Sequence, residues 1–214
     1  MKKIQFFLIF LIFSSSLQYK GVDLSEYEGD VDWSRLSPNI DFAFLRANWK
    51  IGLDENQFEN NYAGAKNYGV SVGAYWYCYA HNEEEAAREA KDCLDIIKGK
   101  QFEYPIFYYI IKQEIFDTGL SNQILDTFCS ILEKAGYYCG IFSALPFYFD
   151  YFDKDISNKY PVWVGCWDSN EPTIPHSIWQ YGVEYMEGVK GPVDVDITNT
   201  DFPQIIKEKH LNGY

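Results

Sequence analysis

The feature that most constrains the fold is a regular alternation of short apolar runs with longer amphipathic stretches. The apolar runs have the length of strands, and the stretches between the earlier runs have helical spacing and a glycine at the end. Strands that alternate with helices in this way pair in parallel and are covered by the helices. The predicted strands are 21–25, 42–47, 71–80, 105–111, 139–144, 161–167, 177–182 and 193–197, and the predicted helices are 56–69, 82–99 and 121–136.

This pattern predicts about eight strands, with helices between the early ones and short links between the last ones. Strands as apolar as these suit a sheet that is buried on both faces. We therefore expect an α/β fold, an irregular TIM-like β/α barrel of about eight strands whose last third is rich in strands. No repeat, low-complexity tract or linker divides residues 19–214, so they are predicted to form one domain.

The first 18 residues have the pattern of a secretory signal peptide. Lys2 and Lys3 precede an apolar run from Ile4 to Phe13, and small polar residues follow it. The run is too short to cross a bilayer, and no second run is long enough. The sequence therefore predicts cleavage within residues 14–18 and a chain free of the membrane. Its destination is the outside of the cell, or the lumen of a secretory or phagocytic compartment.

Charge and cysteine content narrow the classes of function. The formal charge of -13 becomes -15 once Lys2 and Lys3 are removed, and such an acidic chain is unsuited to nucleic acid, which is bound by Lys and Arg. Five cysteines are typical of an oxidising compartment, and their odd number leaves at least one unpaired. No close Cys-x-x-Cys pair is present, which argues against zinc, and we read the cysteines as structural.

Acidic and aromatic residues recur where predicted strands reach one rim of the barrel. In β/α barrels the active site lies at the carboxyl ends of the strands. The candidates there are Asp23, Ser25, Glu26, Tyr75, Trp76, Tyr77, Trp179, Gln180, Tyr181, Asp194 and Asp196. Acids beside flat rings are the chemistry of a saccharide cleft, so we expect these side chains to converge.

Seven stretches strengthen this interpretation because of the order in which they occur. They are GVDLSEYEGDVDW, DFAFLRA, VGAYWYCYA, YPIFYYI, GYYCGIFSA, SIWQY and VDVDITNTDF, and they cover roughly residues 19–202. Together they resemble glycoside hydrolase family 25, the Chalaropsis-type lysozymes that cleave bacterial peptidoglycan. The resemblance implies an eight-stranded barrel, secretion, and N-acetylmuramidase activity on the β-1,4 MurNAc-GlcNAc bond without metal or cofactor. We expect a monomer whose partner is peptidoglycan or a related glycan.

The family's functional positions carry over unevenly. Its first aspartate matches Asp23, and its last aspartate best matches Asp194, so these two are the expected catalytic acids. The residues expected to bind substrate are Tyr75, Tyr77, Trp179 and Asp196. Because the register of the last motif could slip by two residues, Asp196 is also the alternative to Asp194.

The family's catalytic Asp-x-Glu falls on Tyr109 and Ile111. In the family the Glu protonates the leaving oxygen and the Asp is its partner carboxylate, but Ile111 has no proton to give. A phenol with an ordinary pKa near 10 needs a separate base and acid to act as a nucleophile. Phe142 also stands where the family commonly has a tyrosine. The sequence therefore predicts that hydrolysis is weak or lost.

Two alternatives stay open. The first is an active muramidase with a relocated acid, although nothing in the sequence indicates a raised pKa for Asp23, Asp194 or Asp196. Other acids that could take the role are Glu26, Glu28, Glu103, Glu114 and Asp117. The first two reach the cleft only if their loop folds over it, and the last three are expected in loops. The second alternative is an interaction module that binds no glycan.

Overall fold

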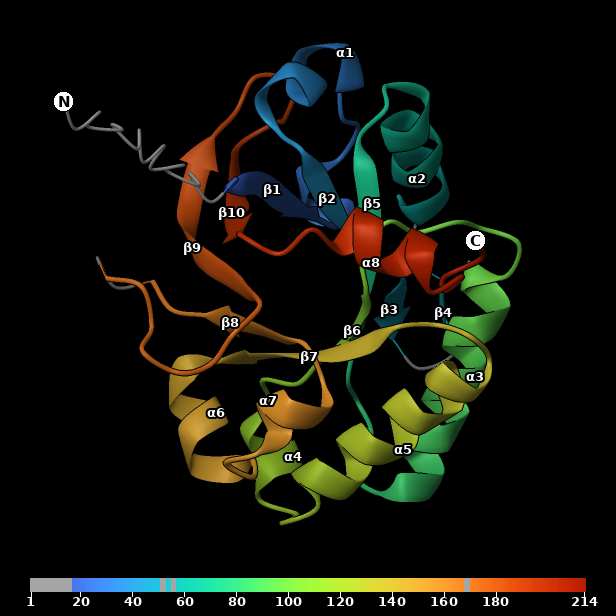
Figure 1. Ribbon diagram of the computed structural model, residues 1–214, viewed down its shortest axis with the longest axis vertical. Helices are drawn as coiled ribbons and strands as arrows, with labels where there is room; N and C mark the ends of the chain where they lie inside the picture. Colours follow the sequence, from blue (N-terminus) through green and yellow to red (C-terminus); the bar gives the residue numbers. More distant parts are fainter. Residues whose placement is uncertain (1–16, 51–52, 55–56, 168–169) are drawn as a thin grey trace, which may run out of the picture.

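The computed structural model describes residues 17–50, 53–54, 57–167 and 170–214, so residues 1–16 of the predicted signal peptide lie outside the described residues. Within this part of the chain eight strands close into one barrel, in the order β1-β10-β9-β8-β7-β6-β5-β2 (Figure 1). The strands are β1 (Tyr19–Leu24), β2 (Phe42–Arg46), β5 (Ser71–Tyr77), β6 (Ile106–Tyr109), β7 (Cys139–Ala144), β8 (Val162–Gly165), β9 (Ile178–Tyr185) and β10 (Pro192–Thr198). The predicted α/β barrel is confirmed.

Strand direction decides which residues share a rim. β10 runs antiparallel to β1 and β9, whereas all other neighbouring barrel strands pair in parallel. The amino end of β10 therefore lies beside the carboxyl end of β1, and Asp194 pairs directly with Asp23. Residues that face each other across two strands point to the same side of the sheet, so both aspartates face the barrel interior.

The helices cover the outside of the barrel. They are α1 (Trp33–Leu36), α2 (Phe58–Asn67), α3 (Glu83–Ile97), α4 (Gln113–Phe116), α5 (Ser121–Lys134), α6 (Leu145–Tyr151), α7 (Ile156–Lys159) and α8 (Phe202–Glu208). Helices α3 to α7 gather in the lower half of Figure 1, against β6 to β8, and α1 and α2 lie above. A short ribbon of β3 (Asn48–Lys50) and β4 (Leu53–Asp54) stands apart from the barrel.

The predicted helices form where local chemistry favours them. In α3 the Asn82 side chain accepts a hydrogen bond from the Glu85 amide at 2.9 Å, and three glutamates occupy the first turn, where the helix dipole favours negative charge. The short helices α4, α6, α7 and α8 were not predicted. Two strands are shorter than predicted. β6 ends at Tyr109 rather than at 111, before α4 begins at Gln113, and β5 ends at Tyr77 rather than at 80.

Aromatic rings fill the barrel interior. Phe44 of β2 stacks on Trp163 of β8 with centroids 4.5 Å apart. A side chain at Gly21 or Gly73 would collide with the rings of Phe42 or Phe44, since a Cβ there would lie 2.1 Å or 2.4 Å from ring carbons. Glycine at these positions therefore leaves room for the rings.

Helix α8 closes the amino-terminal end of the barrel. Phe202 and Ile206 of this helix pack into the same interior cluster as Tyr104, and the Phe202 and Tyr104 rings lie 5.5 Å apart. In Figure 1, α8 lies near the centre of the picture, across the barrel strands. Only the opposite end, at the carboxyl ends of the parallel strands, is left open for a cleft.

All five cysteines are free thiols and all are buried. Cys129 of α5 and Cys139 of β7 lie close together, each within 4.0 Å of the Gly140 carbonyl oxygen. Burial raises the pKa of both thiols, so neither is a reactive thiolate at neutral pH. The prediction of structural cysteines agrees with this placement, and no disulfide joins them.

Candidate active site

A cleft of about 200 Å³ opens at the carboxyl ends of the parallel strands. It is lined by Asp23, Ser25, Tyr27, Glu28, Arg46, Tyr75, Tyr77, Tyr109 and Asp194. Four of the predicted site residues, Asp23, Tyr75, Tyr77 and Asp194, are therefore brought together. Arg46 and Tyr27 were missed. The position of Arg46 at the end of a strand was the available signal, whereas Tyr27 sits in a turn that the apolar pattern does not describe.

Asp23 is the most constrained acid of the cleft. Its side chain is buried, and its Oδ2 accepts a hydrogen bond from Gln180 Nε2 at 2.8 Å. Burial raises its pKa well above the usual range, and the nearby charges of Asp196 and Asp194 raise it further, against the opposing effect of Gln180. The pKa of Asp194 is raised by burial and then by the charge of Glu28. Nothing in the sequence indicated these raised pKa values, because the burial that causes them depends on the closed barrel.

Asp196 lies deeper than the cleft. It is fully buried, its Oδ1 accepts a hydrogen bond from Trp163 Nε1 at 2.7 Å, and its Oδ2 has no hydrogen-bond partner among the described residues. Burial raises its pKa well above the usual range, and the charge of Asp194 adds to the effect. Asp196 is not among the residues that line the cleft. The structure thus places Asp194, and not Asp196, among the residues that line the cleft.

Tyr109 occupies the wall of the cleft that β6 forms. Its ring stacks on Phe142 with centroids 3.9 Å apart and planes 8° from parallel, and it lies 5.3 Å from the rings of both Tyr75 and Tyr77. Ile111, two residues further on, packs against the same interior cluster. Burial, and then the charges of Asp23 and Asp194, raise the pKa of the Tyr109 phenol well above its usual range. On this side of the cleft the lining residue is Tyr109, with Phe142 and Ile111 packed in the same interior cluster, and β6 supplies no carboxylate.

Among the other acids considered from the sequence, Glu28 lines the cleft and the rest do not. Glu28 lines the cleft because the 3₁₀ turn Glu26–Glu28 folds over it, and the Ser25 amide donates to Glu28 Oε2 at 2.7 Å. Glu114 in α4 is 59% exposed and pairs with Lys112 at 3.3 Å, away from the cleft. Of the remaining three, Glu26 and the exposed Asp117 do not line the cleft, and Glu103 is buried beside Lys66 near the closed end.

Positive charge lies over the aromatic rim of the cleft. The Arg46 guanidinium carbon is 5.0 Å from the Tyr77 ring centroid, and Arg46 Nε donates to the Asn48 carbonyl at 2.7 Å. Lys112 Nζ lies 4.3 Å from the centroid of the Tyr79 ring. Contacts of this kind between a cation and a ring hold both in place. The cleft therefore has an acidic side, formed by β1 and β10, and an aromatic side with cations at its edge.

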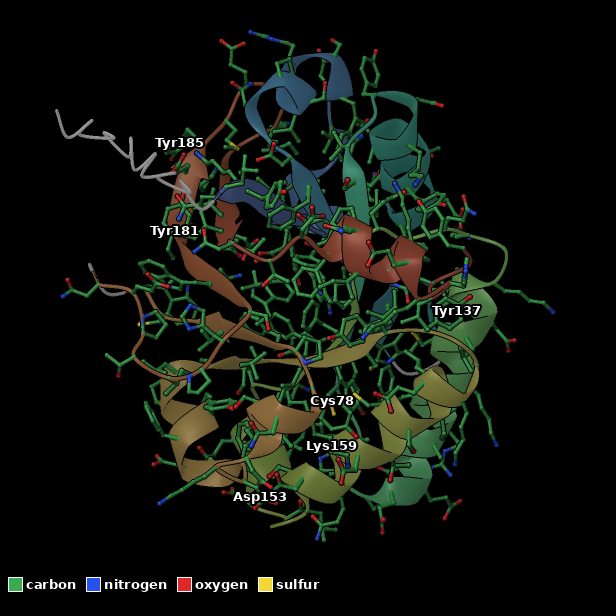
Figure 2. All side chains as sticks on the ribbon, in the orientation of Figure 1. Cys78, Tyr137, Asp153, Lys159, Tyr181 and Tyr185 are labelled. Atoms are coloured by element: carbon green, nitrogen blue, oxygen red, sulfur yellow. The ribbon has the colours of Figure 1, made fainter. Side chains whose placement is uncertain are left out.

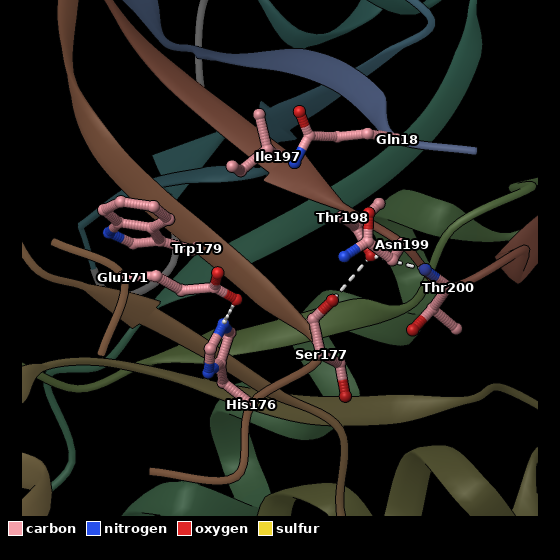
Figure 3. A pocket seen from close by; sticks show the side chains of 9 residues that line it. All are labelled: Gln18, Glu171, His176, Ser177, Trp179, Ile197, Thr198, Asn199 and Thr200. Carbon is pink, nitrogen blue, oxygen red and sulfur yellow. Dashed lines mark hydrogen bonds and ion pairs between the residues drawn. The ribbon is translucent and has the colours of Figure 1, made fainter. Parts of the chain in front are cut away.

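Trp179 and Tyr181 do not join the cleft. Their neighbours Ile178 and Gln180 face the barrel interior, and alternation along β9 turns both rings outward. Trp179 instead lines a second hollow of about 100 Å³ (Figure 3). Trp76 also points outward, to Glu89 of α3. These three residues are not brought to the cleft because side chains alternate along a strand and theirs face outward, whereas Gln180 between Trp179 and Tyr181 faces inward and reaches Asp23.

Two further findings concern metals and membranes. In the described ranges no group of three or more His, Cys, Asp or Glu side chains is arranged to hold a metal ion. None of the helices described is both long and apolar enough to cross a bilayer.

The sequence matches the model of a family described as "Glycosyl hydrolases family 25" over residues 22–188. It is 23% identical over 200 residues to YegX of Escherichia coli K12, and the alignment covers 86% of this chain and 71% of YegX. It is also 23% identical over 185 residues to the autolytic lysozyme of Clostridium acetobutylicum, covering 83% of this chain and 55% of that protein.

Solved structures share the fold. The modular autolysin LytC of Streptococcus pneumoniae superimposes with a TM-score of 0.74 and 26% identity, over 84% of this chain and 46% of LytC. A lysozyme from Streptomyces coelicolor superimposes with a TM-score of 0.73 and 21% identity, over 85% of this chain and 92% of that one. The chain thus spans about half the length of LytC and of the clostridial lysozyme.

Proposed function

We propose a function for this chain, which belongs to glycoside hydrolase family 25. It binds bacterial peptidoglycan in the cleft and hydrolyses it weakly or not at all. The observation that carries the proposal is the β6 wall of the cleft. There Tyr109 is stacked on Phe142 and surrounded by rings, and Ile111 follows it. The resemblance assigns the catalytic Asp-x-Glu to these two positions.

Cleavage of a glycosidic bond requires two carboxyl groups that flank it, one of which donates a proton to the leaving oxygen. Asp23 and Asp194 are cross-strand neighbours on the adjacent strands β1 and β10, so both lie on the same wall of the cleft. The wall across from them carries no carboxylate. A positioned general acid contributes about 100- to 10,000-fold to the rate, and its absence accounts for the loss that we propose.

Tyr109 is a poor substitute for either missing acid. A general acid works best when its pKa is close to the working pH, whereas the pKa of Tyr109 is raised well above that of an ordinary phenol. The same shift keeps the phenol protonated, so that it is no nucleophile at neutral pH. Its stacked ring is instead suited to binding.

Glycan binding is supported by the lining that remains. Tyr75, Tyr77 and Tyr109 present rings around the cleft, and Tyr27 is 70% exposed at its mouth. Flat rings with polar tips are suited to a ligand that is apolar on its faces and polar at its edge, as a sugar is. The acids and Arg46 supply hydrogen-bond acceptors and donors beside the rings.

One observation favours a second candidate function, an active muramidase with a relocated acid. The raised pKa values of Asp23 and Asp194 mean that a carboxyl group of this cleft stays protonated at higher pH than usual, and that is what a general acid requires. Glu28 is a further carboxylate in the same cleft. We favour the first function because Asp23 and Asp194 lie on the same wall of the cleft rather than on opposite walls.

The proposal includes export of the chain as a monomer, with residues 1–18 removed. The support is the short apolar run after Lys2 and Lys3, which has the length of a signal peptide rather than of a membrane span. Sequencing the amino terminus of the protein recovered outside the producing cells tests this part. A terminus within residues 15–19 is expected, and an intact Met1 would contradict it.

The test of the function is clearing of a Gram-positive cell-wall suspension, with sedimentation scoring binding in the same tubes. The protein is compared with Tyr109→Asp/Ile111→Glu, which places carboxylates on the β6 wall. The matched control is Tyr109→Phe/Ile111→Leu, which changes the same positions without adding charge. Ile111→Glu alone is included because it restores a carboxyl group only at the position that the resemblance assigns to the proton donor.

We expect all forms to sediment with the wall and only forms with an added carboxylate to clear it. If the unmodified protein clears the suspension as fast as the double variant, the relocated-acid function is correct. Glu28→Gln and Asp194→Asn then identify the acid. If the unmodified protein does not sediment with the wall, both glycan functions fail and the chain is an interaction module.

A further inference from the structure

A second hollow lies on the outer wall of the barrel, away from the cleft. It is formed by the start of β9, the end of β10 and the loop that precedes β9 (Figure 3). Its lining residues are Gln18, Glu171, His176, Ser177, Trp179, Ile197, Thr198, Asn199 and Thr200. Nothing in the proposed function uses it.

The position of the hollow makes it independent of the cleft. Asp194 lies at the cleft end of β10, and Thr198 lies four residues further along the same strand. At about 3.4 Å per residue these positions are roughly 14 Å apart along the strand, and Trp179 points outward rather than into the barrel. One sugar ring therefore cannot occupy the cleft and the hollow together.

Some polar groups of the hollow are already committed to the protein. Thr198 Oγ1 donates to the Ser177 carbonyl at 2.6 Å and accepts from the Thr200 amide at 3.0 Å. His176 Nε2 lies 3.2 Å from Glu171 Oε1, and its Nδ1 lies 2.8 Å from the Ile174 carbonyl. Figure 3 shows the first two bonds and the His176–Glu171 pair as a frame around the hollow. These contacts hold the shape of the site.

Four other polar groups are uncommitted. The side-chain amides of Gln18 and Asn199 and the hydroxyls of Ser177 and Thr200 make no hydrogen bond to any other residue in the described part of the chain. All four are uncharged, and together they can both donate and accept. The lining contains no Lys or Arg, so an anion is not favoured. The one carboxylate, of Glu171, already has His176 as its partner at 3.2 Å, so a cation is not favoured either.

Two apolar side chains complete the lining. The single polar atom of Trp179, Nε1, donates to the Cys166 carbonyl at 2.7 Å, which leaves its ring as an apolar surface in the hollow. Ile197 lies on the neighbouring strand, where it pairs with Trp179. The hollow thus offers a small apolar contact next to neutral donors and acceptors.

We infer that this hollow binds the acetamido group of an N-acetylated amino sugar. An acetamido group has one N–H donor, one carbonyl acceptor and one methyl group, which match the Asn199, Ser177 and Thr200 groups and the Trp179 and Ile197 surfaces. About 100 Å³ holds roughly three waters at liquid density. That volume suits a substituent rather than a whole sugar ring, so the ring rests across the mouth beside Trp179.

The test is a titration followed by ¹H–¹⁵N correlation spectra, in which the Trp179 indole signal is assigned by its loss in Trp179→Phe. Triacetylchitotriose and its fully deacetylated trimer are added in parallel. We expect the acetylated trimer to shift the Trp179 signal, both in the unmodified protein and in the cleft variant Tyr77→Ala. The deacetylated trimer leaves that signal unchanged.

Two variants sharpen the result without risk to the fold. Asn199→Ala removes an exposed side chain that bonds to no described residue, and the affinity read from the Trp179 signal should fall about fivefold, the effect of one hydrogen bond. Tyr185→Ala is the matched control, because Tyr185 is 84% exposed on the same strand but outside the hollow (Figure 2). It should leave the affinity unchanged.

Four outcomes overturn the inference. In the first, the Trp179 signal stays fixed while cleft signals move, which leaves the proposed function standing and confines glycan to the cleft. In the second, both trimers shift the Trp179 signal equally, so the acetamido group is not what is recognised. In the third, Asn199→Ala binds as tightly as the unmodified protein. If neither trimer moves any signal, this inference fails, and wall sedimentation decides the proposed function separately.

Discussion

Two buried glutamates at opposite ends of the barrel each accept three hydrogen bonds, yet their pKa values shift in opposite directions. Glu103, near the closed end, accepts from Lys66 Nζ, the Tyr214 hydroxyl and the Val72 amide. Burial raises its pKa, but these bonds and the Lys66 charge outweigh burial, so the pKa lies below the usual range.

Glu89, behind the cleft, accepts from Trp76 Nε1 at 3.2 Å, the Tyr108 hydroxyl at 2.8 Å and the Tyr79 amide at 3.0 Å. No described Lys or Arg pairs with it, and burial raises its pKa to about 7. The comparison shows that neutral hydrogen bonds alone do not offset the burial of a carboxylate here, whereas a cation does.

The same difference extends to the acids of the cleft. Asp23 and Asp196 are buried without an ion pair to any described residue, and the pKa of each is raised. The buried Glu103 at the closed end is therefore paired with a cation, whereas the buried Asp23, Asp196 and Glu89 at the cleft end have no ion pair with a described residue. Uncompensated charge lowers stability, and it is typical of sites kept for function rather than for folding.

The largest effect is expected from breaking the compensation at the closed end. Glu103→Leu leaves Lys66 partly buried without its partner and should lower the free energy of unfolding by about 3–5 kcal/mol. Urea unfolding at pH 7 measures this. The control is Glu187→Leu, which breaks the pair with Arg35, whose side chains are 60% and 70% exposed, and should change stability by less than about 1 kcal/mol. Equal effects of the two substitutions would contradict the role given to burial.

The pH dependence of stability tests the buried acids at the cleft end, which have no ion pair with a described residue. The folded pKa of Glu89 is about 7 against 4.5 for the free side chain, so the folded state binds the proton more tightly. Its contribution is fully present below pH 4.5 and is lost as the pH rises through 7. The size of that loss is about 3 kcal/mol. Asp23, Asp194 and Asp196 act in the same direction.

Unfolding free energies measured from pH 4.5 to pH 8 should therefore fall as the pH rises. Glu89→Gln cannot ionise, so its profile should be flatter over this range. A protein that becomes more stable between pH 5 and pH 7 would show that the buried acids are compensated after all.

A smaller effect is expected when one uncompensated charge is removed. Asp196→Asn keeps an oxygen to accept from Trp163 and removes the buried charge, so it should stabilise the fold by about 1–2 kcal/mol at pH 8. The gain should shrink as the pH falls, because Asp196 itself becomes neutral. Thermal unfolding at pH 8 and pH 4.5 measures both, with the exposed Asp95→Asn as a control that should show no such pH dependence.

The smallest effect concerns Glu28. Glu28→Gln can still accept from Ser25, so the free energy of unfolding should change by only about 0.5 kcal/mol. Because the charge of Glu28 raises the pKa of Asp194, its removal should lower that pKa. Carboxyl carbon signals followed through a pH titration show the direction, and an unchanged Asp194 would mean that the two groups do not interact.

The sequence by itself determined the barrel and led to the prediction that the acid pair is lost. Apolar periodicity is a local property, so the eight barrel strands could be placed to within a few residues. Short helices such as α8 were not predicted because each lies in a link that is too short to show helical periodicity. Tyr109 and Ile111 were visible as substitutions because chain order alone aligns that strand with the family.

Only the tertiary structure decided which side chains share a surface and what charge they carry. The outward turn of Trp179 and the depth of Asp196 follow from the pairing of β9 with β10, whose register shifts between Val195 and Asp196. The raised pKa values of the acids follow from closure of the barrel, which removes water from groups far apart in the chain. Register and burial are non-local, so residue types and spacing could not reveal them.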